Sequence, residues 1–151
     1  MEPEKVIAGK YVLIVDDEQD ILDTLVDMLD MCRLDTAASF SKAEKLLKEN
    51  PYDIAVLDIM GVDGYELLKI ANGQNIPAVM LTAKAQTNDS LNRLAEEGAA
   101  YYAPKDMMHE LDIFLADVFQ AIAEGKSSWE KMLERVCISM TMTSMEQRGG
   151  G

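Results

Sequence analysis

The chain has 151 residues, 48% of them hydrophobic, which is enough for one compact domain and a short appendage. Its 27 acidic residues outnumber the 14 basic ones and give a formal net charge of -13. Nucleic-acid binding depends on clustered Lys and Arg that contact phosphates, so we expect no direct nucleic-acid partner. A cation or a basic protein surface suits this charge better.

The sequence also lacks the features of an exported or disulfide-bonded protein. Residues 1–9 form an N-terminal arm that lacks the long apolar run of a signal peptide, and no later stretch is apolar enough to span a bilayer. Cys32 and Cys137 have no CxxC spacing, so reduced thiols are a simpler interpretation than a zinc site or a disulfide framework. We therefore expect a cytoplasmic protein without a membrane partner.

Short apolar runs alternate with amphipathic helical patterns along the chain. The first run, 11–15, is continuous, which is typical of a strand buried on both faces, and it stops at Asp16 and Asp17. Helical spacing follows it, so the acidic pair lies where a strand leads into a helix. The pattern then predicts further strands over 34–39, 54–57, 76–81 and 99–103, and helices over about 21–32, 40–49, 64–71, 88–97 and 107–123.

This alternation predicts the fold class. Five strands joined by helices run parallel, and right-handed crossovers place helices on both faces of an open sheet. We expect an α/β fold, a flavodoxin-like doubly wound sheet of five parallel strands in the order 2-1-3-4-5.

Polar side chains follow four of the predicted strands at their carboxyl ends. Ligands of such sheets bind beyond these ends, where the strand order reverses. Asp16 and Asp17 follow the first strand, Asp58 ends the third, Thr82 ends the fourth and Lys105 follows the fifth. The sequence therefore predicts that these five side chains meet at one edge of the sheet.

Three carboxylates at one edge repel one another, so we expect the site to hold a cation or some protons, and Mg²⁺ is the natural occupant. Mg²⁺ prefers hard oxygen ligands and is commonly bound by one or two carboxylates together with a phosphate. Beside such an ion, Asp58 can attack a phosphoryl group and form an acyl phosphate. The Lys105 ammonium and the Thr82 hydroxyl can then offset charge on the phosphoryl oxygens.

The run from about Lys10 to Ala123 resembles the receiver domain of two-component response regulators of the chemotaxis-regulator type. The motifs that carry the resemblance are Val-Asp16-Asp17-Glu, Leu-Asp58-Ile-Met-Gly-Val-Asp-Gly64, Leu-Thr82-Ala83 and Tyr102-Ala-Pro-Lys105. It implies a receiver domain over 10–124 that is a signalling module rather than an enzyme. Its Asp58 would take a phosphoryl group from a histidine kinase, a phosphotransfer protein or a small phosphodonor.

The resemblance also implies a role for each metal ligand. Asp17 would bind Mg²⁺ directly and Asp16 largely through water. Asp58 and the backbone carbonyl of Met60 would complete the protein ligands.

A switch follows from the same resemblance. Thr82 and Tyr102 match the family's switch pair, through which phosphorylation remodels the face formed by 88–97, 99–103 and 107–123. A downstream protein partner would recognise that face.

The sequence departs from the family pattern at two points. The loop between Asp58 and Gly64 is shorter than usual and lacks a Met-Pro step, which bears on the Met60 carbonyl as a ligand. Lys105 is followed by Asp106 instead of proline, which bears on the direction of its side chain. These departures keep open a degenerate receiver that acts as a constitutive interaction scaffold.

A third interpretation is an aspartate-based phosphohydrolase of the haloacid dehalogenase type. Such enzymes also join Mg²⁺ to an aspartyl phosphate on an α/β sheet. Their usual Asp-x-Asp after the first strand is absent, because Asp16 is followed by Asp17, Glu18 and Gln19.

Residues 125–151 form a C-terminal extension that is too short for a separate output domain. Trp129, Met132 and Leu133 continue at helical spacing and predict an added amphipathic helix, whereas the alternation over 138–143 allows a strand. The apolar stripe can pack on the same chain, form a homodimer or contact a partner. A stand-alone regulator is favoured.

Overall fold

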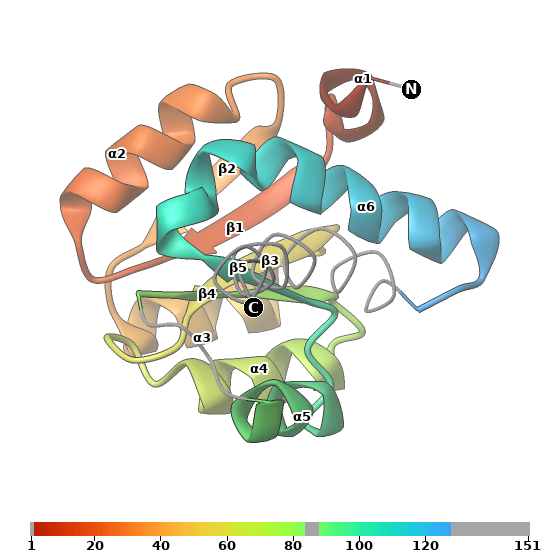
Figure 1. Ribbon diagram of the computed structural model, residues 1–151. Helices are drawn as coiled ribbons and strands as arrows, with labels where there is room; N and C mark the ends of the chain where they lie inside the picture. Colours follow the sequence, from red (N-terminus) through yellow and green to blue (C-terminus); the bar gives the residue numbers. More distant parts are fainter. Residues whose placement is uncertain (1, 84–87, 128–151) are drawn as a thin grey trace, which may run out of the picture.

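A five-stranded parallel sheet in the order β2-β1-β3-β4-β5 forms the centre of the molecule. The structure is a computed structural model that describes residues 2–83 and 88–127 (Figure 1). The strands are β1 (Tyr11–Val15), β2 (Arg33–Ala37), β3 (Ile54–Asp58), β4 (Ala78–Thr82) and β5 (Tyr101–Pro104). All the pairings are parallel, which confirms the predicted flavodoxin-like fold.

Helices cover both faces of this sheet. They are α1 (Pro3–Ile7), α2 (Gln19–Met28), α3 (Phe40–Glu49), α4 (Gly64–Gly73), α5 (Asn88–Glu96) and α6 (Leu111–Glu124), with a 3₁₀ helix at Lys105–Glu110. Figure 1 shows α2 and α6 on one side of the sheet and α3, α4 and α5 on the other. Every residue of β1, β3 and β4 is buried as a result, which explains their continuous apolar runs.

Local signals fix several helix ends. The Ser39 hydroxyl accepts a hydrogen bond from the Lys42 amide (3.3 Å) at the start of α3, and Asn50-Pro51 ends that helix. Helix α6 ends at Glu124, and the φ of 69° at the following Gly125 suits glycine. The chain therefore turns where the sequence places these residues.

The N-terminal arm contains a helix that the sequence pattern does not predict. In α1, Ile7 is fully buried, and the helix packs beside α6. The Gly9 amide donates to the Met31 carbonyl (2.9 Å) and the Cys32 thiol contacts the Ile7 carbonyl (3.4 Å), which ties the arm to the segment after α2. Residues 3–10 therefore belong to the packed domain.

Some boundaries also differ from the expected ones. The first predicted helix ends at Met28 rather than near Cys32, and β5 begins at Tyr101. The helix predicted over 107–123 starts as the 3₁₀ helix and becomes α-helical at Leu111. The predicted helix or strand of the C-terminal extension lies outside the described residues. Within 2–83 and 88–127, no helix is both long and apolar enough to cross a bilayer.

Candidate functional site

The carboxyl ends of β1, β3, β4 and β5 bring the predicted polar side chains to one edge of the sheet. Asp16 follows β1 directly, while Asp58 and Thr82 are the last residues of their strands. The register pairs Asp58 with Leu81 and Thr82 with Pro104, which sets these strand ends side by side. A hollow of about 320 Å³ at this edge is lined by Asp17, Glu18, Asp58, Met60, Gly61, Thr82, Ala83 and Lys105. The predicted convergence is confirmed.

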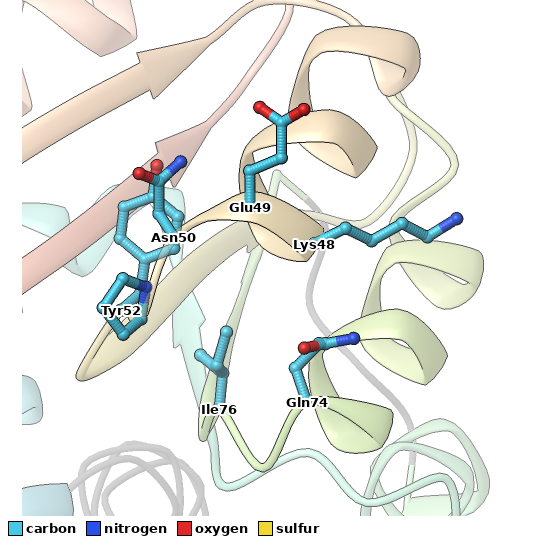
Figure 2. Close-up of a pocket in the computed structure, with 7 residues that line it drawn as sticks. Lys48, Glu49, Asn50, Tyr52, Gln74 and Ile76 are labelled. Atoms are coloured by element: carbon cyan, nitrogen blue, oxygen red, sulfur yellow. The ribbon is translucent and has the colours of Figure 1, made fainter.

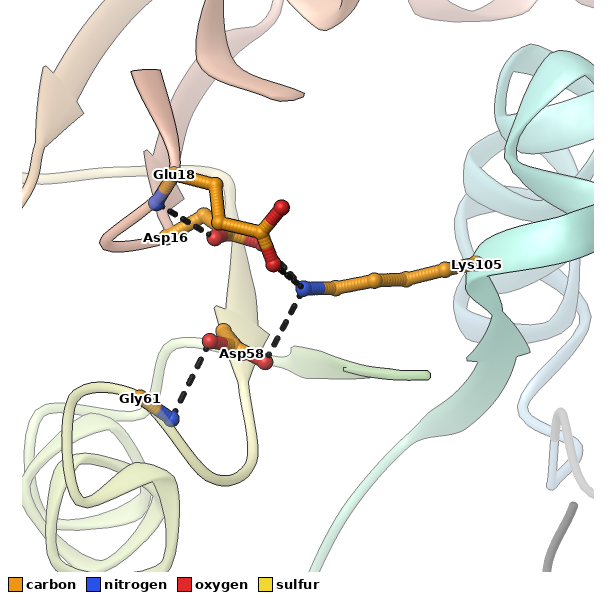
Figure 3. Close-up of polar contacts among 5 residues, drawn as sticks. All are labelled: Asp16, Glu18, Asp58, Gly61 and Lys105. Atoms are coloured by element: carbon orange, nitrogen blue, oxygen red, sulfur yellow. Dashed lines mark hydrogen bonds and ion pairs between the residues drawn. The ribbon is translucent and has the colours of Figure 1, made fainter. Parts of the chain in front are cut away.

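Lys105 is the central cation of this site (Figure 3). Its Nζ lies 2.9 Å from Asp16 Oδ2, 3.3 Å from Glu18 Oε1 and 3.5 Å from Asp58 Oδ1. Burial lowers the pKa of Lys105, but the neighbouring carboxylates, Asp16 first, outweigh it and hold the pKa above its ordinary value. The missing proline after Lys105 does not turn the ammonium away from the site.

Asp16 is the most enclosed of the acidic groups and is fully buried. Its Oδ1 accepts a hydrogen bond from the Glu18 amide (2.9 Å). Its Oδ2 accepts no hydrogen bond within the described part of the chain and meets Lys105 as an ion pair. Burial raises the pKa of Asp16, and the Glu18 amide and Lys105 oppose that rise. The Lys105 ammonium is therefore the cation that this oxygen faces.

Asp58 is held from both sides. Its Oδ1 faces Lys105, and its Oδ2 accepts a hydrogen bond from the Gly61 amide (3.2 Å), as Figure 3 shows. The side chain is buried but lines the hollow. An incoming group in the hollow therefore meets a carboxylate whose orientation is already fixed.

The short loop after Asp58 closes as a tight turn. The Gly64 amide donates to the Ile59 carbonyl (3.0 Å), and Asp63 takes the left-handed conformation with a φ of 53°. A Cβ at Gly61 would lie 2.2 Å from Asp17 Oδ1, and one at Gly64 would lie 2.3 Å from the Asp58 carbonyl oxygen. Gly64 therefore lets the loop pass close to the β3 backbone, and Gly61 leaves room for the Asp17 carboxylate.

Met60 lies at the rim of the hollow, with 78% of the residue exposed. The Met60–Gly61 peptide is trans, so its N–H and C=O point in opposite directions. Because the Gly61 N–H is directed at Asp58 Oδ2, the Met60 carbonyl points away from that oxygen.

Carboxylate oxygens of Asp16, Asp17 and Glu18 lie within 4.8 Å of one another. Three hard oxygen donors beside an open hollow fit a Mg²⁺ ion. Glu18 is absent from the sequence-based set of site residues. Its position directly after Asp16 and Asp17 is the sequence feature that would have identified Glu18 as a site residue.

Thr82 and Tyr102 are both buried at the ends of neighbouring strands. Thr82 lines the hollow, and Tyr102 pairs with Met80 in the sheet register. The expected switch pair therefore starts with its aromatic ring inside the protein.

A second hollow, of about 390 Å³, lies at the opposite edge of the sheet, before β3 and β4 (Figure 2). Its lining includes Tyr52, whose hydroxyl donates to Asp35 (2.7 Å), and Asn50, whose amide donates to the Leu46 carbonyl (3.2 Å). The Tyr52 contact joins β2 to the segment between α3 and β3, and the Asn50 contact satisfies a carbonyl at the end of α3, so these polar groups stabilise the fold.

Comparisons with known proteins agree with this geometry. Residues 12–114 match the family described as the response regulator receiver domain. The response regulator SaeR of Staphylococcus aureus strain USA300 is 35% identical over 115 residues, which cover 70% of this chain and 50% of that protein. The chain thus spans about half the length of the curated relatives it matches.

Solved structures show the same likeness. The Francisella response regulator 1452 receiver domain has a TM-score of 0.67 and 28% identity, over 76% of this chain and 99% of that one. The N-terminal domain of a response regulator receiver protein from Methanoculleus marisnigri JR1 has a TM-score of 0.58 and 31% identity, over 76% and 94%.

The sheet, its acidic strand ends and the lysine after β5 are those of a receiver domain, and the response regulators that the chain resembles are signalling proteins. This chain belongs to the family of response regulator receiver domains of two-component systems. Phosphoaspartate and Mg²⁺ are typical of that family.

Proposed function

We propose that the chain is a phosphorylation-dependent signalling module whose Asp58 accepts a phosphoryl group from a histidine kinase, a phosphotransfer protein or a small phosphodonor. The observation that carries the proposal is the position of Asp58 between the Lys105 ammonium and the acidic cluster, at the edge of an open hollow. A nucleophile, a fixed cation and a set of metal-binding oxygens therefore share one small space.

The chemistry follows from these side chains. An oxygen of Asp58 bonds to phosphorus, and the bond from phosphorus to the donor's nitrogen or oxygen breaks, with the donor keeping the electron pair. Lys105 pairs with one phosphoryl oxygen, and the Thr82 hydroxyl donates to another. A Mg²⁺ ion held by Asp16, Asp17 and Asp58 would offset the remaining negative charge.

The partner surfaces are part of the same proposal. Met60 exposes an adaptable apolar side chain at the rim of the hollow, which favours contact with a protein phosphodonor. Withdrawal of Thr82 toward the phosphoryl group leaves room beside it for Tyr102 to repack. That change would alter the face of α5, β5 and α6 for a downstream protein partner.

The test is phosphorylation by acetyl phosphate with Mg²⁺, followed by intact-protein mass measurement. We expect one acid-stable, base-labile phosphoryl adduct that disappears when Mg²⁺ is chelated. Asp58→Asn should abolish the adduct, and Asp63→Asn, a matched change in the same loop at a conformation that asparagine tolerates, should keep it.

Two results would count against the proposal. No adduct with either acetyl phosphate or a cognate kinase would favour a constitutive scaffold. Sustained turnover of phosphomonoesters would favour a phosphohydrolase.

A further inference from the structure

The short loop leaves one side of the cation site without a backbone ligand. The Gly61 N–H is committed to Asp58 Oδ2 at 3.2 Å, and the Met60 carbonyl on the same trans peptide points away from it. Turning that carbonyl toward Asp58 would require rotation of the whole peptide and loss of the hydrogen bond. A cation beside Asp58 therefore needs another oxygen.

Glu18 is placed to supply that oxygen. Its backbone N–H is fixed by Asp16 Oδ1 at 2.9 Å, so the residue is anchored at the floor of the site. Its carboxylate lies within 4.8 Å of the Asp16 and Asp17 oxygens and lines the same hollow as Asp58. The side chain is 61% exposed and its contact with Lys105 is a 3.3 Å ion pair, so it can move at little cost.

We propose that Glu18 is a direct ligand of the bound Mg²⁺ and takes the place that the Met60 carbonyl does not fill. The inference rests on the proposed function, because it concerns the same cation. On ligation, Glu18 exchanges its contact with Lys105 for the ion. Lys105 keeps Asp16 and Asp58 as neighbours at 2.9 and 3.5 Å and remains directed at the nucleophile.

Affinity alone does not test this role. Removal of any nearby negative charge weakens the binding of a divalent cation through Coulomb attraction, without direct contact. The number of water molecules on the ion is the better measure, because loss of one protein ligand opens one coordination position to water. Mn²⁺, which also prefers oxygen ligands, allows that number to be measured by water proton relaxation.

The experiment compares the wild type with Glu18→Ala and with the control Asp20→Ala. Asp20 is an exposed acid in the first turn of α2, so its loss removes the same charge close by. We expect the Mn²⁺ complex of Glu18→Ala to hold one more inner-sphere water than the wild type, and Mg²⁺ affinity to fall roughly tenfold or more. Asp20→Ala should lower affinity less and leave hydration unchanged.

The outcomes separate the two proposals. A wild type that binds neither Mg²⁺ nor Mn²⁺ would overturn the proposed function itself. A wild type that binds Mn²⁺ while Glu18→Ala shows identical hydration would overturn only the role of Glu18, since the ligand would then be another group. Circular dichroism confirms that each variant is folded.

Discussion

Replacing Gly61 with alanine perturbs the point where the short loop lies against Asp17. The added Cβ would stand 2.2 Å from Asp17 Oδ1, 2.5 Å from Cγ and 2.7 Å from Oδ2, whereas ordinary van der Waals contact begins at 3.4 Å. The whole carboxylate must therefore retreat. Asp17 is exposed and can do so without moving the backbone.

The expected effect falls on metal binding rather than on folding. Misplacement of a functional group by about 1 Å is costly in a preorganised site, and loss of ligand support typically lowers metal affinity about 10–100-fold. For Mg²⁺ this corresponds to about 1.4–2.7 kcal/mol. The free energy of unfolding should change by less than about 1 kcal/mol, because the side chain yields and alanine restricts the unfolded chain.

Isothermal titration with Mg²⁺ and urea unfolding measure the two quantities. Gly73→Ala is the matched control, since nothing lies within 4 Å of a Cβ there and the residue ends α4. It should keep Mg²⁺ affinity. A Gly61→Ala protein that binds Mg²⁺ as tightly as the wild type would refute the reasoning, because Asp17 would then not be confined by the loop.

Two further predictions concern stability and thiol chemistry. Gly64→Ala brings a Cβ to 2.3 Å from the Asp58 carbonyl oxygen and 2.7 Å from Ile59 Cα, so backbone must shift and urea unfolding should show a loss of about 1–3 kcal/mol. An unchanged urea midpoint would mean that the loop accommodates the added Cβ without strain. Burial, with a smaller contribution from the Asp30 charge, raises the pKa of the Cys32 thiol from 9.0 to about 11. In a Cys137→Ser background, iodoacetamide at pH 8 should therefore react with Cys32 on the order of 100-fold more slowly than with a free thiol. The alkylation rate should climb as the pH approaches 11, and rapid alkylation at pH 8 would contradict the raised pKa of the Cys32 thiol.

The sheet could be predicted from the sequence because its strands carry their own signal. The runs 11–15, 54–57 and 78–81 are buried on both faces and therefore continuously apolar. Polar residues at their carboxyl ends must meet once the strands are parallel. That rule alone predicts that Asp58 and Lys105 lie close together.

Other features depend on contacts that no local pattern encodes. With five residues, α1 is too short for helical periodicity, and its burial comes from packing against α6. The ion pair between Glu18 and Lys105 joins residues 87 positions apart. The direction of the Gly61 N–H depends on the exact path of the loop, which a shortened motif alone does not reveal.

Lys105 shows why a local departure can leave a site intact. Its neighbours in sequence start a 3₁₀ helix, whereas its ammonium is placed by three carboxylates from β3 and from the segment after β1. The Asp16 contact is almost free of solvent, with the lysine side chain 13% exposed and the aspartate fully buried. Loss of such a contact would leave a buried charge without a partner, which costs far more than a change of residue after Lys105.

Charge balance then explains why phosphorylation should depend on a divalent cation. When ionised, Asp16, Asp17, Glu18 and Asp58 bring four negative charges to a site where Lys105 is the positive group in contact. A phosphoryl group adds more negative charge and would be repelled by such a site. Two positive charges on an ion among these oxygens offset this repulsion, so we expect Asp58 to accept the group only when the acidic cluster holds a divalent cation.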